Sequence, residues 1–99
     1  MQQNRFSDIS NFFIAGISYR NADAGTRSRF AVNDLQYENL LNLAPAAGLE
    51  SLFILSTCNR TEIYGFAENA GQLVALLTKQ TKGTAAALMQ LAYIKNGLH

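Results

Sequence analysis

The chain has 99 residues, of which 48% are hydrophobic, so it can fold as one domain with a single modest core. No apolar stretch approaches the roughly 20 residues that cross a bilayer, and the polar N-terminus lacks the layout of a secretory signal. The sequence therefore predicts a cytoplasmic protein without a membrane partner. The formal net charge of +1 is too small to indicate nucleic-acid binding by itself. One cysteine and one histidine exclude an intrachain disulfide and leave too few ligands for zinc, so no metal is expected.

The first third of the chain predicts a loose tail, a strand and a loop. Residues 1–10 are polar and predict the tail, whereas residues 12–17 are apolar and β-rich, which is typical of a buried strand. The polar segment that follows, residues 18–29, contains Gly25 and predicts a loop. This loop is long for a structureless connection, which favours a functional role.

An amphipathic helix is predicted next. Asn33 is a good N-cap, with Gln36 at the capping-box position. Apolar residues then recur at helical spacing, namely Tyr37, Leu40, Leu41 and Ala44. We assign Leu40 and Leu41 to the core. Pro45 and Gly48 are expected to end the helix.

Two strands joined by a tight turn are predicted after this helix. Residues 51–56 form an apolar run, the second strand. Residues 61–66 alternate polar and apolar side chains, which indicates a strand with one face in water. Residues 57–60 are left as the turn between them.

The last third predicts two helices and a final strand. Asn69 begins one helix, with Leu76 and Leu77 in the core, and Gly83 stops it. Lys79 and Lys82 are expected to complement the dipole of this helix. A short helix over residues 84–91 and a strand over residues 92–94 complete the chain. The order predicts an α+β, ferredoxin-like split βαβ fold, with helices on one face of an antiparallel four-stranded sheet.

The turn carries the most informative residues. Cys58 lies where one strand ends and the next begins, beside Thr57, Asn59 and Arg60. This position places the sulfur at the rim of the sheet, where Arg60 could enrich the thiolate or pair with a substrate carboxylate. Two interpretations stay open from spacing alone: a reactive nucleophile, or a buried and inert cysteine beside a polar turn.

The decapeptide LSTCNRTEIY, residues 55–64, closely resembles the signature of glutamyl-tRNA reductases. Residues 16–19 resemble the first strand and loop start of that family, and Arg27 falls where its loop carries an arginine. The resemblance spans roughly residues 12–99 and is strongest around Cys58.

The loop departs from the family pattern Gly-Leu-Asn-His-Lys-Thr-Ala-Pro-Val. Tyr19 stands at the position of the usual histidine, Asn21 at that of the threonine and Asp23 at that of the proline. The role of the family histidine is therefore not carried over to Tyr19. A conserved histidine of the family falls just after His99, to which no role is assigned.

The resemblance implies a mechanism in which the Cys58 thiolate attacks glutamyl-tRNA and keeps the glutamyl group as a thioester. Hydride from NADPH then yields glutamate-1-semialdehyde for tetrapyrrole (porphyrin) synthesis. Thr57 and Arg60 match positions that hold the glutamyl group, whereas Ser56 and Asn59 shape the turn. The possible substrate-contacting residues of the loop are Tyr19, Asn21 and Arg27. Arg20, Arg27 and Arg29 are favoured for a substrate or tRNA contact, and a contact of Lys79 or Lys82 with tRNA phosphates stays open.

The resemblance also implies the domain organisation. Residues 1–99 correspond to an N-terminal catalytic domain, and the NADPH-binding and dimerisation domains are absent. No glycine-rich dinucleotide fingerprint occurs here, so we expect this chain to bind no NADPH. The full-length enzyme is expected to be a homodimer, and this chain a monomer.

The rival interpretation is a non-catalytic ferredoxin-like module that binds an amino acid or RNA. The strand over residues 61–66 has the aromatic residues Tyr64 and Phe66 of an RNA-recognition surface. It also carries Glu62 and no basic residue, unlike the usual pattern.

Overall fold

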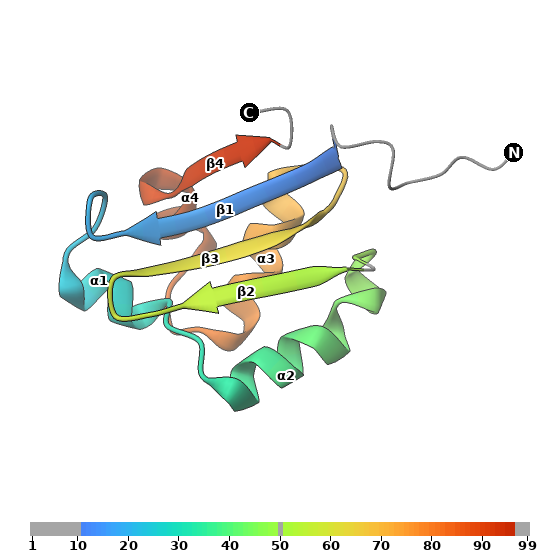
Figure 1. Ribbon diagram of the computed structural model, residues 1–99, viewed down its shortest axis with the longest axis horizontal. Coiled ribbons are helices and arrows are strands. Elements are labelled where there is room, and N and C mark those ends of the chain that lie inside the picture. The colour runs from blue at the N-terminus through green and yellow to red at the C-terminus, as the bar shows by residue number, and fades with distance from the viewer. Residues whose placement is uncertain (1–10, 50, 97–99) are drawn as a thin grey trace, which may run out of the picture.

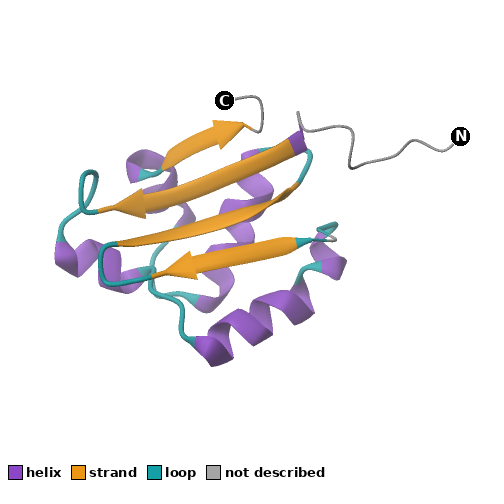
Figure 2. Cartoon of the chain, in the orientation of Figure 1, coloured by secondary structure: helices purple, strands orange, loops and turns teal. Residues whose placement is uncertain are grey.

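The computed structural model describes residues 11–49 and 51–96, so the predicted tail and His99 lie outside the described residues. The elements follow in the order β1 (Phe12–Ser18), α1 (Ala24–Arg29), α2 (Asp34–Leu43), η3 (Pro45–Ala47), β2 (Leu52–Ser56), β3 (Arg60–Phe66), α3 (Ala70–Gln80), α4 (Ala85–Leu91) and β4 (Tyr93–Asn96). The strands form one antiparallel sheet in the order β2-β3-β1-β4. Helices α3 and α4 lie behind this sheet, and α2 runs along its β2 edge (Figures 1 and 2). The predicted ferredoxin-like α+β fold is confirmed.

The register of the sheet separates a helix-covered face from an open face. Ala15 pairs with Ile63 of β3, and both side chains are fully buried in the core. Since successive side chains of a strand alternate between faces, Gly16 and its partners across the sheet lie on the other side. These partners are Glu62 on β3 and Tyr93 on β4. The open face therefore brings together residues that are far apart in the chain.

The core lies between the sheet and the helices. Ile17 of β1 is buried on the sheet side. Fully or almost fully buried leucines supply the helix side, namely Leu40, Leu73, Leu76, Leu77 and Leu88. Burying one such side chain contributes about 1.5–3 kcal/mol before entropy is counted. Within the described ranges, no helix is both apolar and long enough to pass through a membrane.

Helix α2 confirms most of its sequence signals. Asn33 and Gln36 form the predicted capping box, and Gly48 takes the left-handed conformation, with φ of 84°, after the chain leaves the helix. The assignment of Leu41 to the core is wrong, because its side chain is 45% exposed. Helix α2 lies at the edge of the helix layer beside β2 (Figure 1). At this edge, the rest of the molecule covers only a narrow stripe of α2 that runs through Leu40.

Two further predictions need correction. The segment 18–29 is not a loop throughout, because residues Ala24–Arg29 form helix α1 behind the N-cap Asp23. Strand β3 does not turn the side chain of Glu62 into water, because this residue is only 8% exposed. Arg60, Tyr64 and Tyr93 surround its carboxylate on the open face. Alternation within one strand does not reveal such contacts.

Candidate active site

The β2–β3 turn is organised by the side chain of Thr57. The Thr57 N–H donates to the carbonyl of Arg60 at 2.8 Å, which closes the turn. The Thr57 hydroxyl accepts from the backbone N–H groups of Asn59 (3.2 Å) and Arg60 (3.3 Å). Cys58 stands at the tip, exposed, with its Sγ 3.9 Å from Asn59 Oδ1. The interpretation of a buried cysteine is therefore wrong.

The β1–α1 segment braces this turn at the same end of the sheet (Figure 1). The Tyr19 N–H donates to the Asn59 carbonyl at 2.9 Å. The Arg27 guanidinium donates through Nε to the Cys58 carbonyl (3.3 Å) and through Nη1 to the Ala22 carbonyl (2.7 Å). Arg27 thus fixes the backbone that carries the thiol, although it lies 31 residues earlier in the chain.

Ser56 and Asn21 also hold the local backbone. The Ser56 hydroxyl accepts from the Val32 N–H at 3.0 Å and lies 3.0 Å from the Thr61 hydroxyl. Ser56 therefore links β2 to the segment before α2. Asn21 accepts from the Ser18 hydroxyl at 3.0 Å and keeps the β1–α1 loop compact.

A cleft of about 580 Å³ opens on one side of the turn, and we call it the Arg60 cleft. Polar and charged side chains from three segments line it: Ser18, Tyr19, Arg20, Asn21, Thr57, Asn59, Arg60, Glu62, Tyr93 and Lys95. The predicted residues Tyr19, Asn21, Thr57, Asn59 and Arg60 are thus brought together. Arg27, Ser56 and Cys58 itself are not among the lining residues.

Glu62 is the buried charge of this cleft. The Tyr64 hydroxyl donates to its Oε1 at 2.6 Å, and the Tyr93 hydroxyl donates to its Oε2. Arg60 Nε lies 3.8 Å from Oε1. An added Cβ at Gly16 would lie 2.8 Å from the Glu62 Cγ, so glycine makes room for the carboxylate.

These contacts shift the pKa values of the cluster. Burial raises the pKa of the Glu62 carboxyl, but donation from Tyr64 and Tyr93 and the charges of Arg60 and Lys95 outweigh burial. The pKa of Glu62 therefore lies below its ordinary value of 4.5. The pKa of Tyr93 is strongly raised, chiefly by burial and then by the bond to Glu62. The cluster therefore holds a carboxylate and two neutral tyrosines at neutral pH.

Sequence reasoning missed Glu62 and Tyr93 as site residues. Two signals pointed to them: an acidic residue directly after the cysteine motif, and Gly16 inside an otherwise β-rich strand. A glycine within a strand often marks a close approach of another group. The sequence did not show that the approaching groups were Glu62 and Tyr93, because these residues meet only in the folded sheet.

A second cleft, of about 640 Å³, lies on the other side of the turn, and we call it the Cys58 cleft. It is lined by Ser28, Arg29, Ala31, Val32, Asn33, Gln36, Ser56, Thr57, Cys58 and Lys82. Thr57 lines both clefts. Cys58 lines this cleft but not the Arg60 cleft, so Thr57, the residue before it, forms the boundary between a cleft with a buried carboxylate and a cleft with exposed cations.

Comparisons with known proteins identify the relatives of this chain. A family model described as the N-terminal domain of glutamyl-tRNA(Glu) reductase matches residues 15–99. A glutamyl-tRNA reductase of Flavobacterium psychrophilum is 42% identical over 94 residues, which are 95% of this chain and 23% of the relative. Glutamyl-tRNA reductase 2 of Flavobacterium johnsoniae is 44% identical over 85 residues, which are 86% of this chain and 20% of the relative. This chain thus spans less than a quarter of the length of these relatives.

A solved structure shows the same fold. The glutamyl-tRNA reductase of Methanopyrus kandleri superposes with a TM-score of 0.61 at 18% identity, over 88% of this chain and 19% of that one. The family match covers most of the chain, and the identity to the curated relatives extends over nearly all of it. The chain therefore belongs to the family of glutamyl-tRNA reductase N-terminal domains.

Proposed function

We propose that this chain is the catalytic domain of a glutamyl-tRNA reductase and that Cys58 is its nucleophile. The thiolate attacks the ester carbonyl of glutamyl-tRNA, a sulfur–carbon bond forms, and the bond to the tRNA oxygen breaks. The released 3′-terminal oxygen takes up a proton, and the glutamyl group stays on Cys58 as a thioester. The observation that carries this proposal is the exposed thiol at a braced turn beside a cleft that holds a guanidinium.

Arg60 and Thr57 are proposed to hold the glutamyl group. Because Arg60 Nε approaches Glu62, its terminal nitrogens are the ones offered to the side-chain carboxylate of the substrate. Glu62 thereby acts as a positioning residue, since it orients the planar guanidinium in the cleft. Thr57 acts mainly through the turn, whose backbone its hydroxyl holds.

The residues of the β1–α1 segment divide into two proposed roles. Tyr19 and Asn21 line the Arg60 cleft and are candidates for direct contact with the glutamyl group. Arg27 is better explained as a brace, because its guanidinium bonds the Cys58 carbonyl. Ser56 and Asn59 are proposed to keep the sulfur in place.

Reduction of the thioester belongs to the longer protein. Strand β1 leads into the polar turn of Ser18 to Asn21 and then α1, and β2 leads into the Cys58 turn. Neither strand is followed by a glycine-rich phosphate loop that opens a helix. The residues present do not fit a dinucleotide site. We propose that NADPH binds a separate domain of a cytoplasmic, homodimeric enzyme that serves tetrapyrrole synthesis, and that this chain alone reduces nothing.

Transfer of label from tRNA to protein tests the proposal. The chain is incubated with glutamyl-tRNA labelled in the glutamyl group, and we expect label on Cys58 in a bond that hydroxylamine cleaves. Cys58→Ser, which alters only an exposed side chain, should slow labelling by roughly a thousandfold or more. Label that stays on tRNA in the unaltered chain would contradict catalysis and favour the rival binding module.

A further inference from the structure

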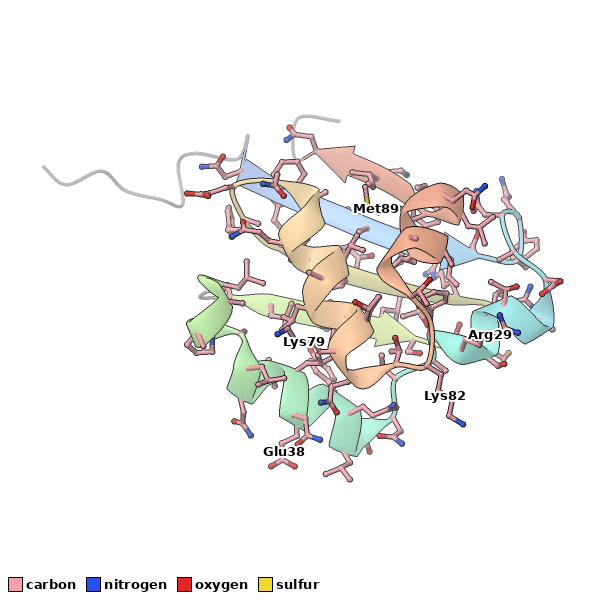
Figure 3. The ribbon with its side chains drawn as sticks, turned by 180° about the vertical axis from the view of Figure 1, so that it is seen from behind. Arg29, Glu38, Lys79, Lys82 and Met89 are labelled. Carbon is pink, nitrogen blue, oxygen red and sulfur yellow. The ribbon has the colours of Figure 1, made fainter. Side chains whose placement is uncertain are left out.

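The Cys58 cleft presents two cations that the proposed acyl chemistry does not use. Arg29 ends helix α1, and Lys82 lies beyond the end of α3. Both line the cleft. The backbone N–H groups of Lys82 and Gly83 donate to the Arg29 carbonyl at 2.9 and 3.1 Å, which fastens the two segments together. Seen from the helix side, the two labelled side chains lie at the same end of the molecule (Figure 3).

Close packing makes this arrangement a built feature of the fold. An added Cβ at Gly83 would lie 2.0 Å from the ring of Phe30, so only glycine lets the α3–α4 segment approach so closely. Phe30 directly follows Arg29 and is almost fully buried. Lys82, which directly precedes Gly83, is therefore held beside Arg29. No carboxylate is among the described residues that line this cleft.

The geometry of the substrate ester indicates which part of the substrate these cations contact. The acyl part and the alcohol part of an ester lie on opposite sides of the carbonyl carbon that the thiolate attacks. If the acyl part occupies the Arg60 cleft, the alcohol part extends across the turn into the Cys58 cleft. Given the proposed function, on which this inference rests, the alcohol part is the 3′ end of tRNA, whose backbone carries one negative charge per phosphate.

We propose that the Cys58 cleft binds the phosphodiester backbone at the 3′ end of tRNA, with Arg29 and Lys82 as the phosphate contacts. Lys82 then has a role beyond that of complementing the dipole of α3, the role that the sequence predicted. Lys79 lies in the last turn of α3 but lines neither cleft. It carries the same charge as Lys82 and is therefore a matched control.

Salt-dependent binding tests the proposal. Affinity of the chain for uncharged tRNA specific for glutamate is measured between about 50 and 200 mM salt, by fluorescence anisotropy. Each lost contact to a single-stranded phosphate reduces the slope of log affinity against log salt by about 0.7. We expect this reduction in Arg29→Gln and in Lys82→Gln, and a larger one in the double variant. An equal reduction in Lys79→Gln, or none in the cleft variants, would overturn the proposal.

A second arm separates this inference from the proposed function. A small glutamyl ester without phosphate should acylate Cys58 at the same rate in the unaltered chain and in both cleft variants, whereas glutamyl-tRNA should acylate the variants several-fold more slowly. If neither substrate acylates Cys58, the proposed function fails, and the salt slopes still report on the cleft.

The phosphates of NADPH are the other ligand that Arg29 and Lys82 could bind. Should Arg29→Gln and Lys82→Gln weaken NADPH binding to the longer enzyme and leave tRNA binding intact, the assignment to tRNA is wrong.

Discussion

The two clefts beside Cys58 differ in how they are built. The Arg60 cleft contains a buried carboxylate that two tyrosine hydroxyls and a guanidinium hold in place. The Cys58 cleft has two exposed cations, one at the end of helix α1 and one on the segment after α3. A fixed guanidinium suits recognition of one small group in one orientation, because its geometry is set before the substrate arrives. Exposed surface cations suit a flexible polyanion, whose binding depends on charge more than on position.

The difference also determines what substitutions do. Glu62 lies on the central strand β3 and contacts residues of β3 and β4, so the Arg60 cleft is part of the sheet. Changes there are expected to affect stability as well as chemistry. Arg29 and Lys82 are exposed, so changes in the Cys58 cleft are expected to affect binding alone. The following predictions test this contrast, from the largest expected effect to the smallest.

Replacing Arg60 with alanine should have the largest effect. Hydrogen bonds to a charged group contribute about 1.5–3 kcal/mol, so we expect acylation by a glutamyl ester to fall by up to about a hundredfold in Arg60→Ala. An alanyl ester has no side-chain carboxylate and serves as the matched substrate, with equal rates expected in both proteins. An equally large loss with the alanyl ester would mean that the turn itself has been damaged.

Gly16→Ala should destabilise the fold through the Arg60 cleft. The new Cβ would lie 2.8 Å from both the Glu62 Cγ and the Thr61 carbonyl oxygen, and backbone cannot move aside cheaply. We expect a loss of about 1–3 kcal/mol in the free energy of unfolding, measured with urea. Gly25→Ala is the control, because its nearest contact would be at 3.7 Å. A loss of equal size in the control would refute the steric explanation.

Glu62→Gln should reduce the dependence of stability on pH. The folded pKa of Glu62 lies below its ordinary value of 4.5, so the unfolded chain binds the proton more readily. The resulting stabilisation is complete above the unfolded pKa and is lost as pH falls through the folded pKa. Urea unfolding between pH 7 and pH 3 should show a shallower acid loss in Glu62→Gln, together with a loss of about 1–2 kcal/mol at pH 7. Parallel curves for the two proteins would contradict a lowered pKa.

Tyr93→Phe should have the smallest effect. It removes one donor to Glu62 and nothing else, which costs about 1 kcal/mol. We expect a matching decrease in unfolding free energy and a higher pKa of Glu62, followed by NMR titration of the carboxyl carbon. Tyr19→Phe removes an exposed hydroxyl that accepts from Arg20, and it should leave both quantities unchanged. If Tyr19→Phe lowers the free energy of unfolding as much as Tyr93→Phe does, the contribution of a tyrosine hydroxyl bond does not depend on its burial, which contradicts the prediction.

The fold was largely predictable because its signals are local. The capping box of Asn33 and Gln36, the left-handed Gly48 and the N-cap Asn69 each act within a few residues. Leu41 was misplaced because helical periodicity shows which residues share a face but not how wide a covered stripe is. Helix α1 was missed because it is short and has no buried residue to give an apolar pattern.

The sequence by itself determined the succession of the four strands along the chain, the turn that bears Cys58 and, through its decapeptide, the family. The tertiary structure alone decided what surrounds the thiol. Tyr93 reaches Glu62, and Arg27 reaches the Cys58 carbonyl, each across 31 residues of chain. Such contacts depend on the register of the sheet and on how the loops pack at its end. The pattern of residues along the chain specifies neither the register nor the loop packing, because packing of the whole core supplies the free energy that selects both.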